Sequence, residues 1–369
     1  MCAPSCVGWW RALDVAASRR DFIKGALALP FVAAGCATAP SAASLAAGRG
    51  VLDDVLSVDV HAHPALFETY WSTTITEHVS AVESGKVGAA FLAAVGDGAA
   101  LSIRSNGSPY AARQPAPGVL FDSAWRQLDV LDAHAGRLGM QPVLHAADVS
   151  TIVAARGRAA IMAVEGCDFL EGRLDNVQKA YDRGVRSLQL VHYRVGEVGD
   201  IQTEPPVHNG LTPFGRDVVR EMNRLGMLVD LAHATYAVVA AAVDASDRPL
   251  LVSHTNIQDY TGFARFVTPA HAQLVGRHGG VLGAWPISIR PAGFDTFISY
   301  IKRMVDAVGV DHVAIGTDMG GIDPRAALFT SYADWPTIPE ALLDRGFGRD
   351  EVAKIMGLNM RRLLEATLG

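Results

Sequence analysis

Eight short apolar runs, separated by segments with the periodicity of amphipathic helices, constrain the fold of this chain more than any other feature. Between the runs, Phe214–Gly226 and Phe297–Gly309 carry apolar residues every three to four positions, as one buried helix face requires. Strands that alternate with helices predict a (β/α)8 barrel, or TIM barrel, of the α/β class. A doubly wound open sheet would carry a glycine-rich phosphate-binding turn after its first strand, and this chain has none. The runs cover residues 55–60, 88–95, 159–164, 187–191, 227–232, 249–253, 280–285 and 312–317.

Ionisable side chains stand at the ends of six of these runs. In a barrel of parallel strands all the carboxyl ends meet at one mouth, where active sites lie. A single His-x-His motif is common by chance, so the other strand ends carry the argument. Burying so many ionisable groups together is costly unless a partner offsets it, and a mixed imidazole and carboxylate set suits zinc. The residues are His61 and His63 after the first run, then Glu165, His192, His233, His254 and Asp318.

The candidate ligands suffice for two Zn²⁺ ions. Two metals about 3.5–4 Å apart can share a bridging carboxylate and a bridging hydroxide, which forms because the metals lower the pKa of water to about 7. Some barrel hydrolases use a carboxylated lysine as the bridge, but none of the five lysines ends a run. Glu165 is therefore the expected bridge. His61 and His63 would hold one ion, and His233 and His254 the other.

Three further residues near these ligands have alternative roles. Asp318 can be a fifth ligand or a general base that passes a proton to a leaving amine. His192 can polarise a carbonyl oxygen as negative charge develops on it. Cys167, two residues after Glu165, can be a ligand or a buried thiol, and the glycine between them favours the thiol.

The first fifty residues predict an export signal and a linker rather than part of the folded domain. Ser18–Lys24 (SRRDFIK) precedes a modest apolar stretch, a pattern typical of a twin-arginine export signal over residues 1–40. The stretch AAGC at Cys36 resembles a lipoprotein cleavage site, although Ala33 replaces the usual leucine and leaves lipidation open. Residues 41–50 read as a linker and 51–369 as the catalytic domain. We expect a periplasmic or lipid-anchored protein that meets the membrane only through such an anchor.

Charge and cysteine usage exclude two classes of protein. A net charge of -6 and a pI near 6.0, with no basic run in the body, argue against a nucleic-acid partner. Three of the four cysteines lie in the first forty residues, which leaves Cys167 alone. A single thiol excludes an intrachain disulfide in the catalytic domain.

The most specific block of sequence, Gly210–His233 (GLTPFGRDVVREMNRLGMLVDLAH) followed by Leu250–Asn256 (LLVSHTN), resembles the membrane dipeptidase family (renal dipeptidase-like, peptidase family M19). Gly184–His192, His312–Gly321 and Ile355–Leu364 follow the order of the family, so the resemblance covers nearly the whole chain after the linker. It implies a binuclear zinc barrel that hydrolyses dipeptides and tolerates a D-residue at the C-terminal position. Dimers are common in the family, so a homodimer is one expectation.

The resemblance also assigns roles by motif. It makes Glu165 the bridging ligand, places His233 and His254 on the second zinc, and makes Asp318 the proton shuttle and His192 the residue that faces the scissile carbonyl. Arg265 would hold the free carboxylate of the substrate, a role that suits a planar guanidinium. The alternative for Arg265 is an ordinary surface charge ahead of a helix.

Two departures from the family pattern affect specificity. His63 stands where the family usually has aspartate, and the loop after His192 lacks the family's asparagine-rich segment. The leading hypothesis is an exported zinc dipeptidase acting on small peptides. The alternatives are a related metal-dependent amidohydrolase acting on N-acyl amino acids, lactones or esters, and an exported binding protein on an inactive barrel.

Overall fold

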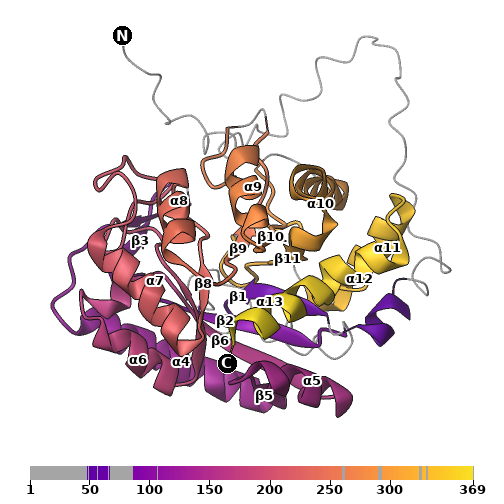
Figure 1. Cartoon of the computed structure of the whole chain (residues 1–369), viewed down its shortest axis with the longest axis horizontal. Coiled ribbons are helices and arrows are strands. Elements are labelled where there is room, and N and C mark those ends of the chain that lie inside the picture. The colour runs from indigo at the N-terminus through magenta and orange to yellow at the C-terminus, as the bar shows by residue number, and fades with distance from the viewer. Residues whose placement is uncertain are drawn as a thin grey trace, which may run out of the picture.

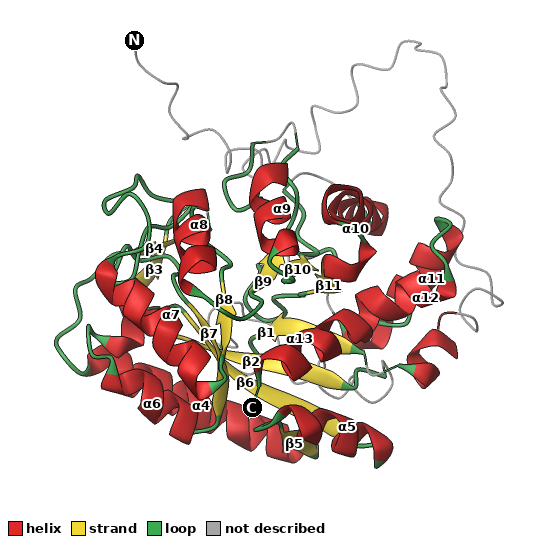
Figure 2. Ribbon diagram, in the orientation of Figure 1, coloured by secondary structure: helices red, strands yellow, loops and turns green. Residues whose placement is uncertain are grey.

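The eight apolar runs form eight parallel strands that close into a barrel, as predicted (Figure 2). A computed structural model describes residues 48, 50–55, 57–64, 66, 86–105, 107–259, 262–289, 293–323, 326–329 and 331–368. Around the barrel the order is β1-β2-β6-β7-β8-β9-β10-β11, and β11 pairs again with β1. The strands are β1 (Val58–Ala62), β2 (Ala89–Val95), β6 (Arg158–Glu165), β7 (Val185–Gln189), β8 (Leu228–Asp230), β9 (Leu251–Thr255), β10 (Val281–Ala284) and β11 (Val313–Ile315).

Helices cover the outside of the barrel (Figure 1). The segment around Phe214 shows why one of them forms: the Thr212 hydroxyl accepts a hydrogen bond from the Gly215 N–H, Pro213 begins the helix, and Gly226 ends it at φ 72°. The helices are α4 (Val119–Arg137), α5 (Ala146–Ala154), α6 (Asp175–Asp182), α7 (Pro213–Leu225), α8 (Tyr236–Ala245), α9 (Pro269–Arg277), α10 (Phe294–Val308), α11 (Thr337–Asp344), α12 (Arg349–Ala353) and α13 (Asn359–Thr367).

Three short strands lie outside the eightfold pattern. Met140–Pro142 (β5) pairs with the first residues of β6, whereas β7 pairs with the later ones. Leu101–Ile103 (β3) and Pro109–Ala111 (β4) form an antiparallel hairpin in the connection between β2 and α4. Because the hairpin follows the carboxyl end of β2, it lies at the mouth of the barrel where the predicted site residues meet.

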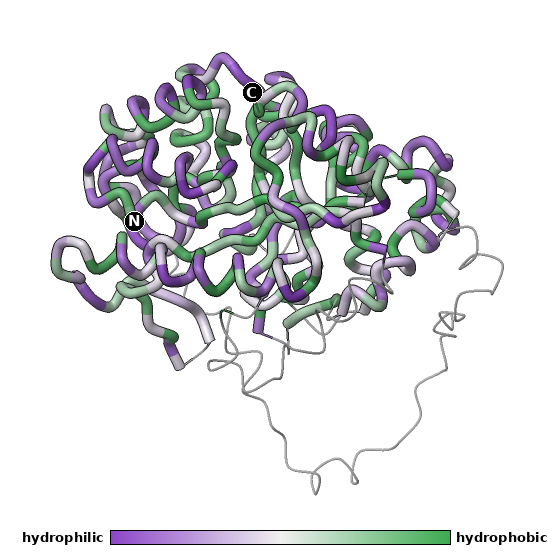
Figure 3. The backbone as a smooth tube through the Cα atoms, turned by 90° about the horizontal axis from the view of Figure 1, so that it is seen from below, coloured by the Kyte–Doolittle hydropathy of each residue, from purple (hydrophilic) through white to green (hydrophobic). Residues whose placement is uncertain are grey.

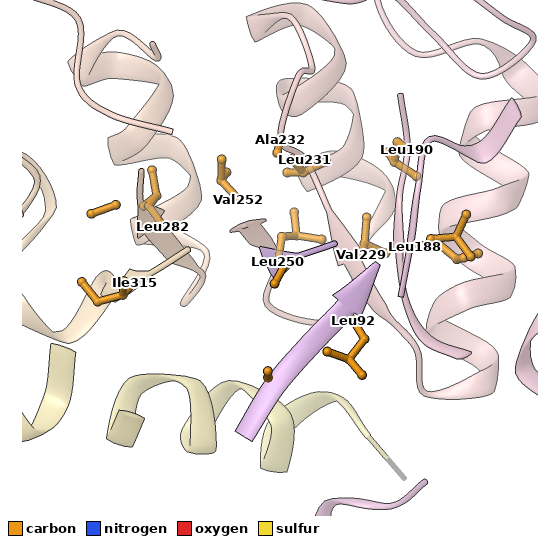
Figure 4. Packing of buried hydrophobic residues seen from close by; sticks show 14 of the residues in the cluster. Leu92, Leu188, Leu190, Val229, Leu231, Ala232, Leu250, Val252, Leu282 and Ile315 are labelled. Carbon is orange, nitrogen blue, oxygen red and sulfur yellow. The ribbon is translucent and has the colours of Figure 1, made fainter. Parts of the chain in front are cut away.

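The strands are buried on both faces. Leu92, Leu188 and Leu282 belong to the cluster that packs between the strands and the outer helices (Figure 4). A second cluster includes Phe91 and Ile161 from the strands and Leu363 from α13. Along the outer helices hydrophobic and hydrophilic residues are interleaved (Figure 3), as expected for helices with one face on the core.

The expected export signal and nearly all of the expected linker lie outside the described residues. No helix in the described part of the chain combines the length and apolar character needed to cross a bilayer.

Candidate metal centre

Five imidazoles surround the carboxylate of Glu165, which ends β6. Its Oε1 atom lies 3.2 Å from His233 Nε2 and 3.5 Å from both His61 Nε2 and His254 Nε2. Its Oε2 atom lies 3.1 Å from His63 Nε2 and 3.3 Å from His192 Nε2. All six side chains are buried. The structure thus brings together all of the residues predicted as ligands, and Glu165 is central to them.

Asp59 holds the first pair of histidines from within β1. Its Oδ1 atom accepts hydrogen bonds from the His61 N–H at 3.2 Å and the Thr317 N–H at 2.9 Å. Its Oδ2 atom accepts from the hydroxyls of Thr317 and Tyr332. The register of β1 against β2 shifts between Asp59 and Ala62, and His61 Nε2 and His63 Nε2 then lie 3.0 Å apart. The carboxylate ties β1 to the segment after β11 directly beneath the ligands.

Asp230 supports the second pair of histidines in the same way. Its Oδ1 atom accepts from the Ala232 N–H at 3.0 Å and from the Ser253 N–H at 2.9 Å, so it joins the end of β8 to β9. His233 and His254 follow, with their Nε2 atoms 3.1 Å apart. His233 has a φ of 65°, a conformation that non-glycine residues rarely adopt and that is concentrated at functional sites.

Hydrogen bonds at Nδ1 leave the Nε2 atoms of three histidines facing the centre. His63 Nδ1 lies 2.7 Å from the Ala93 carbonyl oxygen, His192 Nδ1 2.7 Å from Asp97 Oδ1, and His254 Nδ1 3.0 Å from the Ser253 hydroxyl. Metal-bound histidines are usually oriented in this way. Within the described residues, the donor atoms that lie closest together form two groups: His61, His63 and Glu165, and Glu165, His192 and His233. The second group contains His192 where the sequence predicted His254, although His254 Nε2 lies 3.1 Å from His233 Nε2. Nitrogen and carboxylate donors that converge so closely fit a divalent metal such as zinc.

Burial and neighbouring charges shift the pKa values of these groups in different directions. Burial lowers the pKa of His233 and of His254 well below the ordinary value, with nearby positive charges adding to the effect. Burial also acts to lower the pKa of His63, but Asp318 and Glu165 outweigh it and raise that pKa to about 10. Although burial opposes it, the surrounding imidazoles hold the pKa of Glu165 well below its usual range. A carboxylate with a low pKa suits a bridging ligand.

Arg265 is buried beside the site and is therefore not a surface charge. Its Nη1 atom donates to Gln202 Oε1 at 2.5 Å, and its guanidinium lies 5.4 Å from the ring centroid of Trp285. Its Nε and Nη2 atoms are buried and make no close hydrogen bond within the described residues, although the Tyr193 hydroxyl interacts with the guanidinium. A guanidinium with unpaired donors in a desolvated position can bind a carboxylate through two hydrogen bonds.

The ligands open into a cavity of about 140 Å³ with a mixed lining. His63, Glu165, His192 and Asp318 form the polar end. The remaining wall is mostly apolar and includes residues of the β3–β4 hairpin, which the sequence did not predict. This arrangement places a reactive polar end against an apolar wall, as small-molecule sites commonly do. The apolar lining includes Val95, Leu101, Ile103, Pro109, Phe263, Trp285, Ile287 and Ile322.

The structure also shows the surroundings of two further residues near the ligands, Cys167 and Asp97. Cys167 is a buried thiol, and burial raises its pKa well above the usual value, so it matches the favoured alternative. Asp97 follows β2, the second run, for which the sequence predicted no chemistry. It is fully buried and contacts His192. The signal that could have revealed it is an aspartate two residues after an apolar strand, at the same mouth as the other site residues.

A barrel that gathers imidazoles and a carboxylate at the carboxyl ends of its strands is typical of a metal-dependent hydrolase. The family model for membrane dipeptidase, peptidase family M19, matches residues 50–368, and the chain belongs to this family. The resemblance inferred from the sequence motifs is thereby confirmed.

One curated relative is similar in sequence, and two solved structures are similar in fold. The dipeptidase tcpJ of Claviceps purpurea is 30% identical over 252 residues, which cover 65% of this chain and 59% of that protein. The chain thus spans less than two thirds of this curated relative. Among solved structures, the probable dipeptidase PvdM of Pseudomonas aeruginosa shares the fold with a TM-score of 0.75 at 17% identity, covering 88% of this chain and 98% of that one. A metallopeptidase from Rhodobacter sphaeroides, liganded with a phosphinate mimic of the dipeptide L-Ala-D-Ala, has a TM-score of 0.70 at 22% identity, covering 85% and 99%.

Proposed function

We propose that this protein is a zinc-dependent dipeptidase that hydrolyses small peptides with a free C-terminal carboxylate, including those that end in a D-residue. The observation that carries the proposal is the convergence of five imidazoles on Glu165 beside the buried and partly unpaired guanidinium of Arg265. The first group can hold metals, and the second can bind the negatively charged end of a short peptide.

The donor set fits two Zn²⁺ ions with Glu165 between them. His61 and His63 would hold one ion, and His233 and His254 the other. When bound, the metals would supply Lewis acidity and an activated water as the nucleophile. On binding a metal, which would displace its proton, His63 would supply a neutral donor where the family usually has a carboxylate. Asp318 Oδ1, 3.3 Å from His63 Nε2, places a negative charge on the same side of the site.

The remaining residues bind and orient the substrate and move its proton. Arg265 would clamp the C-terminal carboxylate, which fixes the distance from the end of the peptide to the scissile bond. His192, whose Nε2 atom faces the centre, would contact the scissile carbonyl oxygen as charge develops there. Asp318 has a φ of 51°, a strained conformation that directs it into the site, and it would carry the proton to the leaving amine.

The first test is amino-acid release from matched L,L- and L,D-dipeptides by the metal-stripped and the zinc-reloaded protein. We expect cleavage only after reloading, with a measured stoichiometry of two zincs per chain. Acetylated amino acids and simple esters should be assayed in parallel. Cleavage of these compounds alone, by a protein that holds two zincs, would replace the dipeptidase proposal with the amidohydrolase or esterase alternative. A protein that holds no zinc after reloading would contradict both.

We also propose export through the twin-arginine route, to the periplasm or to a lipid anchor at Cys36. The support is the Ser18–Lys24 motif. Replacing Arg19 and Arg20 with lysine should leave the protein in the cytoplasmic fraction of a suitable host. Unchanged localisation would contradict the route. Size-exclusion chromatography with light scattering tests the further expectation of a homodimer.

A further inference from the structure

Asp97 is a buried carboxylate beside His192, and the described hydrogen bonds of its side chain go to that residue and to the next one, Tyr193. Its Oδ1 atom lies 2.7 Å from His192 Nδ1, and its Oδ2 atom accepts from the Tyr193 N–H at 3.0 Å. The carboxylate is fully buried. A buried carboxylate needs such partners to offset its desolvation, and here they are one imidazole and one backbone amide.

The close approach of two strand ends brings Asp97 to this position. The Gly96 N–H donates to the Glu165 carbonyl at 2.8 Å, and a Cβ atom at Gly96 would lie only 1.9 Å from the Gly166 carbonyl oxygen. Only glycine fits there. Gln127 from α4 also exchanges two hydrogen bonds of 2.9 Å with the backbone of Val95. The end of β2 is therefore fixed against both β6 and α4, and Asp97 has little freedom to move.

We propose that Asp97 is a positioning residue that binds the His192 ring at Nδ1 and so holds it with Nε2, and only Nε2, toward the reacting centre. The backbone amide of Tyr193 can only donate, so it fixes one carboxylate oxygen. The other oxygen can then accept only from Nδ1. The ring is held with its Nε2 atom 3.3 Å from Glu165 Oε2. The inference rests on the proposed function for its kinetic consequence, but not for its geometry.

Asp97→Asn separates this role from simple packing. The amide oxygen of the new side chain must face the Tyr193 N–H, because its NH₂ group would place two donors together. The NH₂ group then faces His192 Nδ1 and forces that atom to accept, which reverses the hydrogen bond. Asp97→Asn thus replaces a charge-assisted hydrogen bond with a weaker, reversed one that holds the ring less firmly, so we expect kcat to fall by about 10–10²-fold, with KM changed by less than about threefold.

A matched control is Asp168→Asn. Asp168 is also a buried carboxylate near Asp97, but it pairs with Arg194 Nη1 at 2.8 Å rather than with an imidazole. We expect kcat of this variant to stay within about threefold of the wild type. The His192→Ala background provides a second control, because the effect of Asp97→Asn should disappear there if Asp97 acts through His192. An undiminished effect in that background would overturn the proposal.

A direct readout that needs no activity is ¹⁵N NMR of the histidine rings in the zinc-loaded protein, with His192 assigned by the signal lost in His192→Gln. We expect a protonated Nδ1 in the wild type and an unprotonated Nδ1 in Asp97→Asn. Unchanged Nδ1 protonation in the variant would overturn the role of Asp97. If the wild type cleaves no dipeptide but the NMR result holds, the proposed function fails while the positioning of His192 stands.

Discussion

The β1–β11 half of the metal centre and the β8–β9 half share one means of support but differ in the charge around their histidines. In each half a buried aspartate, Asp59 or Asp230, accepts one backbone N–H group from its own strand or the segment directly after it, and one from the neighbouring strand or the segment directly after that. The β1–β11 half then places Asp318 against His63. Within the described residues, the β8–β9 half has only Glu165 as a carboxylate at hydrogen-bonding distance from its imidazoles.

This difference in charge suits the two halves of the metal centre to different roles. Burial and the positive charge of Arg265 both favour neutral imidazoles at His233 and His254, which is the state that binds metal. The carboxylate of Asp318 makes the β1–β11 half more negative and gives it a group that can carry a proton. Under the proposed function, an anionic substrate terminus would be attracted toward Arg265, while Asp318, in the other half, would carry the proton.

Glu165→Gln should have the largest effect, because the Glu165 carboxylate lies close to the imidazoles of both halves. We expect the bound zinc to fall from two equivalents to fewer than one and turnover to fall by more than about 10³-fold, as losses at essential residues commonly do. Metal analysis and dipeptide hydrolysis measure both quantities, and circular dichroism checks the fold. Substantial turnover with two zincs retained would contradict the bridging role.

Arg265→Ala should come next and should affect substrates according to their charge. Loss of a two-point contact with a carboxylate is expected to lower kcat/KM by about 10²-fold for dipeptides with a free C-terminus. For the same dipeptides with an amidated C-terminus, the low starting rate should change little. Arg265→Lys keeps the charge but not the planar fork, so partial activity is expected. An equal loss on both kinds of substrate would assign Arg265 a structural role instead.

The sequence predicted the parts of this site that depend on local pattern. An ionisable residue after an apolar run is visible without any knowledge of its partners, so the five histidines, Glu165 and Asp318 could be found. The eight strands could be found in the same way. Arg265 was reached only through the family resemblance.

The supporting aspartates could not be found from local pattern, because their partners are distant in the chain. Asp59 bonds Thr317, 258 residues away, and Asp97 bonds His192, 95 residues away. In the sequence Asp59 and Asp230 are single polar residues within buried strands. The β3–β4 hairpin was missed for another reason: its strands are three residues long, too short to show a periodic pattern.

Asp59→Asn and Asp230→Asn test whether each aspartate supports only its own half. In each aspartate one oxygen accepts both backbone N–H groups, and the amide oxygen of asparagine can keep them. The change removes the second acceptor oxygen and the charge that strengthens these bonds, so we expect a loss of about 2–3 kcal/mol in the free energy of unfolding. Each variant should also release one of two zincs on dialysis against a weak chelator. Spectra of the cobalt-substituted protein would show which site is lost. Release of both zincs by either variant would mean that the halves are not independent.

The smallest expected effect concerns His271, a buried imidazole outside the site that shares the low pKa of the β8–β9 histidines but has no metal role. Burial lowers its pKa from 6.5 to about 4. Between these values the unfolded chain binds a proton that the folded protein does not, so stability is complete above pH 6.5 and falls as the pH decreases toward 4. At pH 5 the loss from this one group should be about 1–2 kcal/mol.

His271→Gln should flatten this part of the profile of unfolding free energy against pH, measured in urea between pH 7 and 4.5 on the zinc-stripped protein. His208→Gln, which removes an exposed imidazole, should leave the slope as in the wild type. A slope unchanged by His271→Gln would show that the buried ring is hydrated or otherwise relieved in solution. The same measurement then applies to the metal centre: zinc should stabilise the folded protein most near neutral pH and progressively less as the pH falls, because protons compete with the metal for the imidazole ligands.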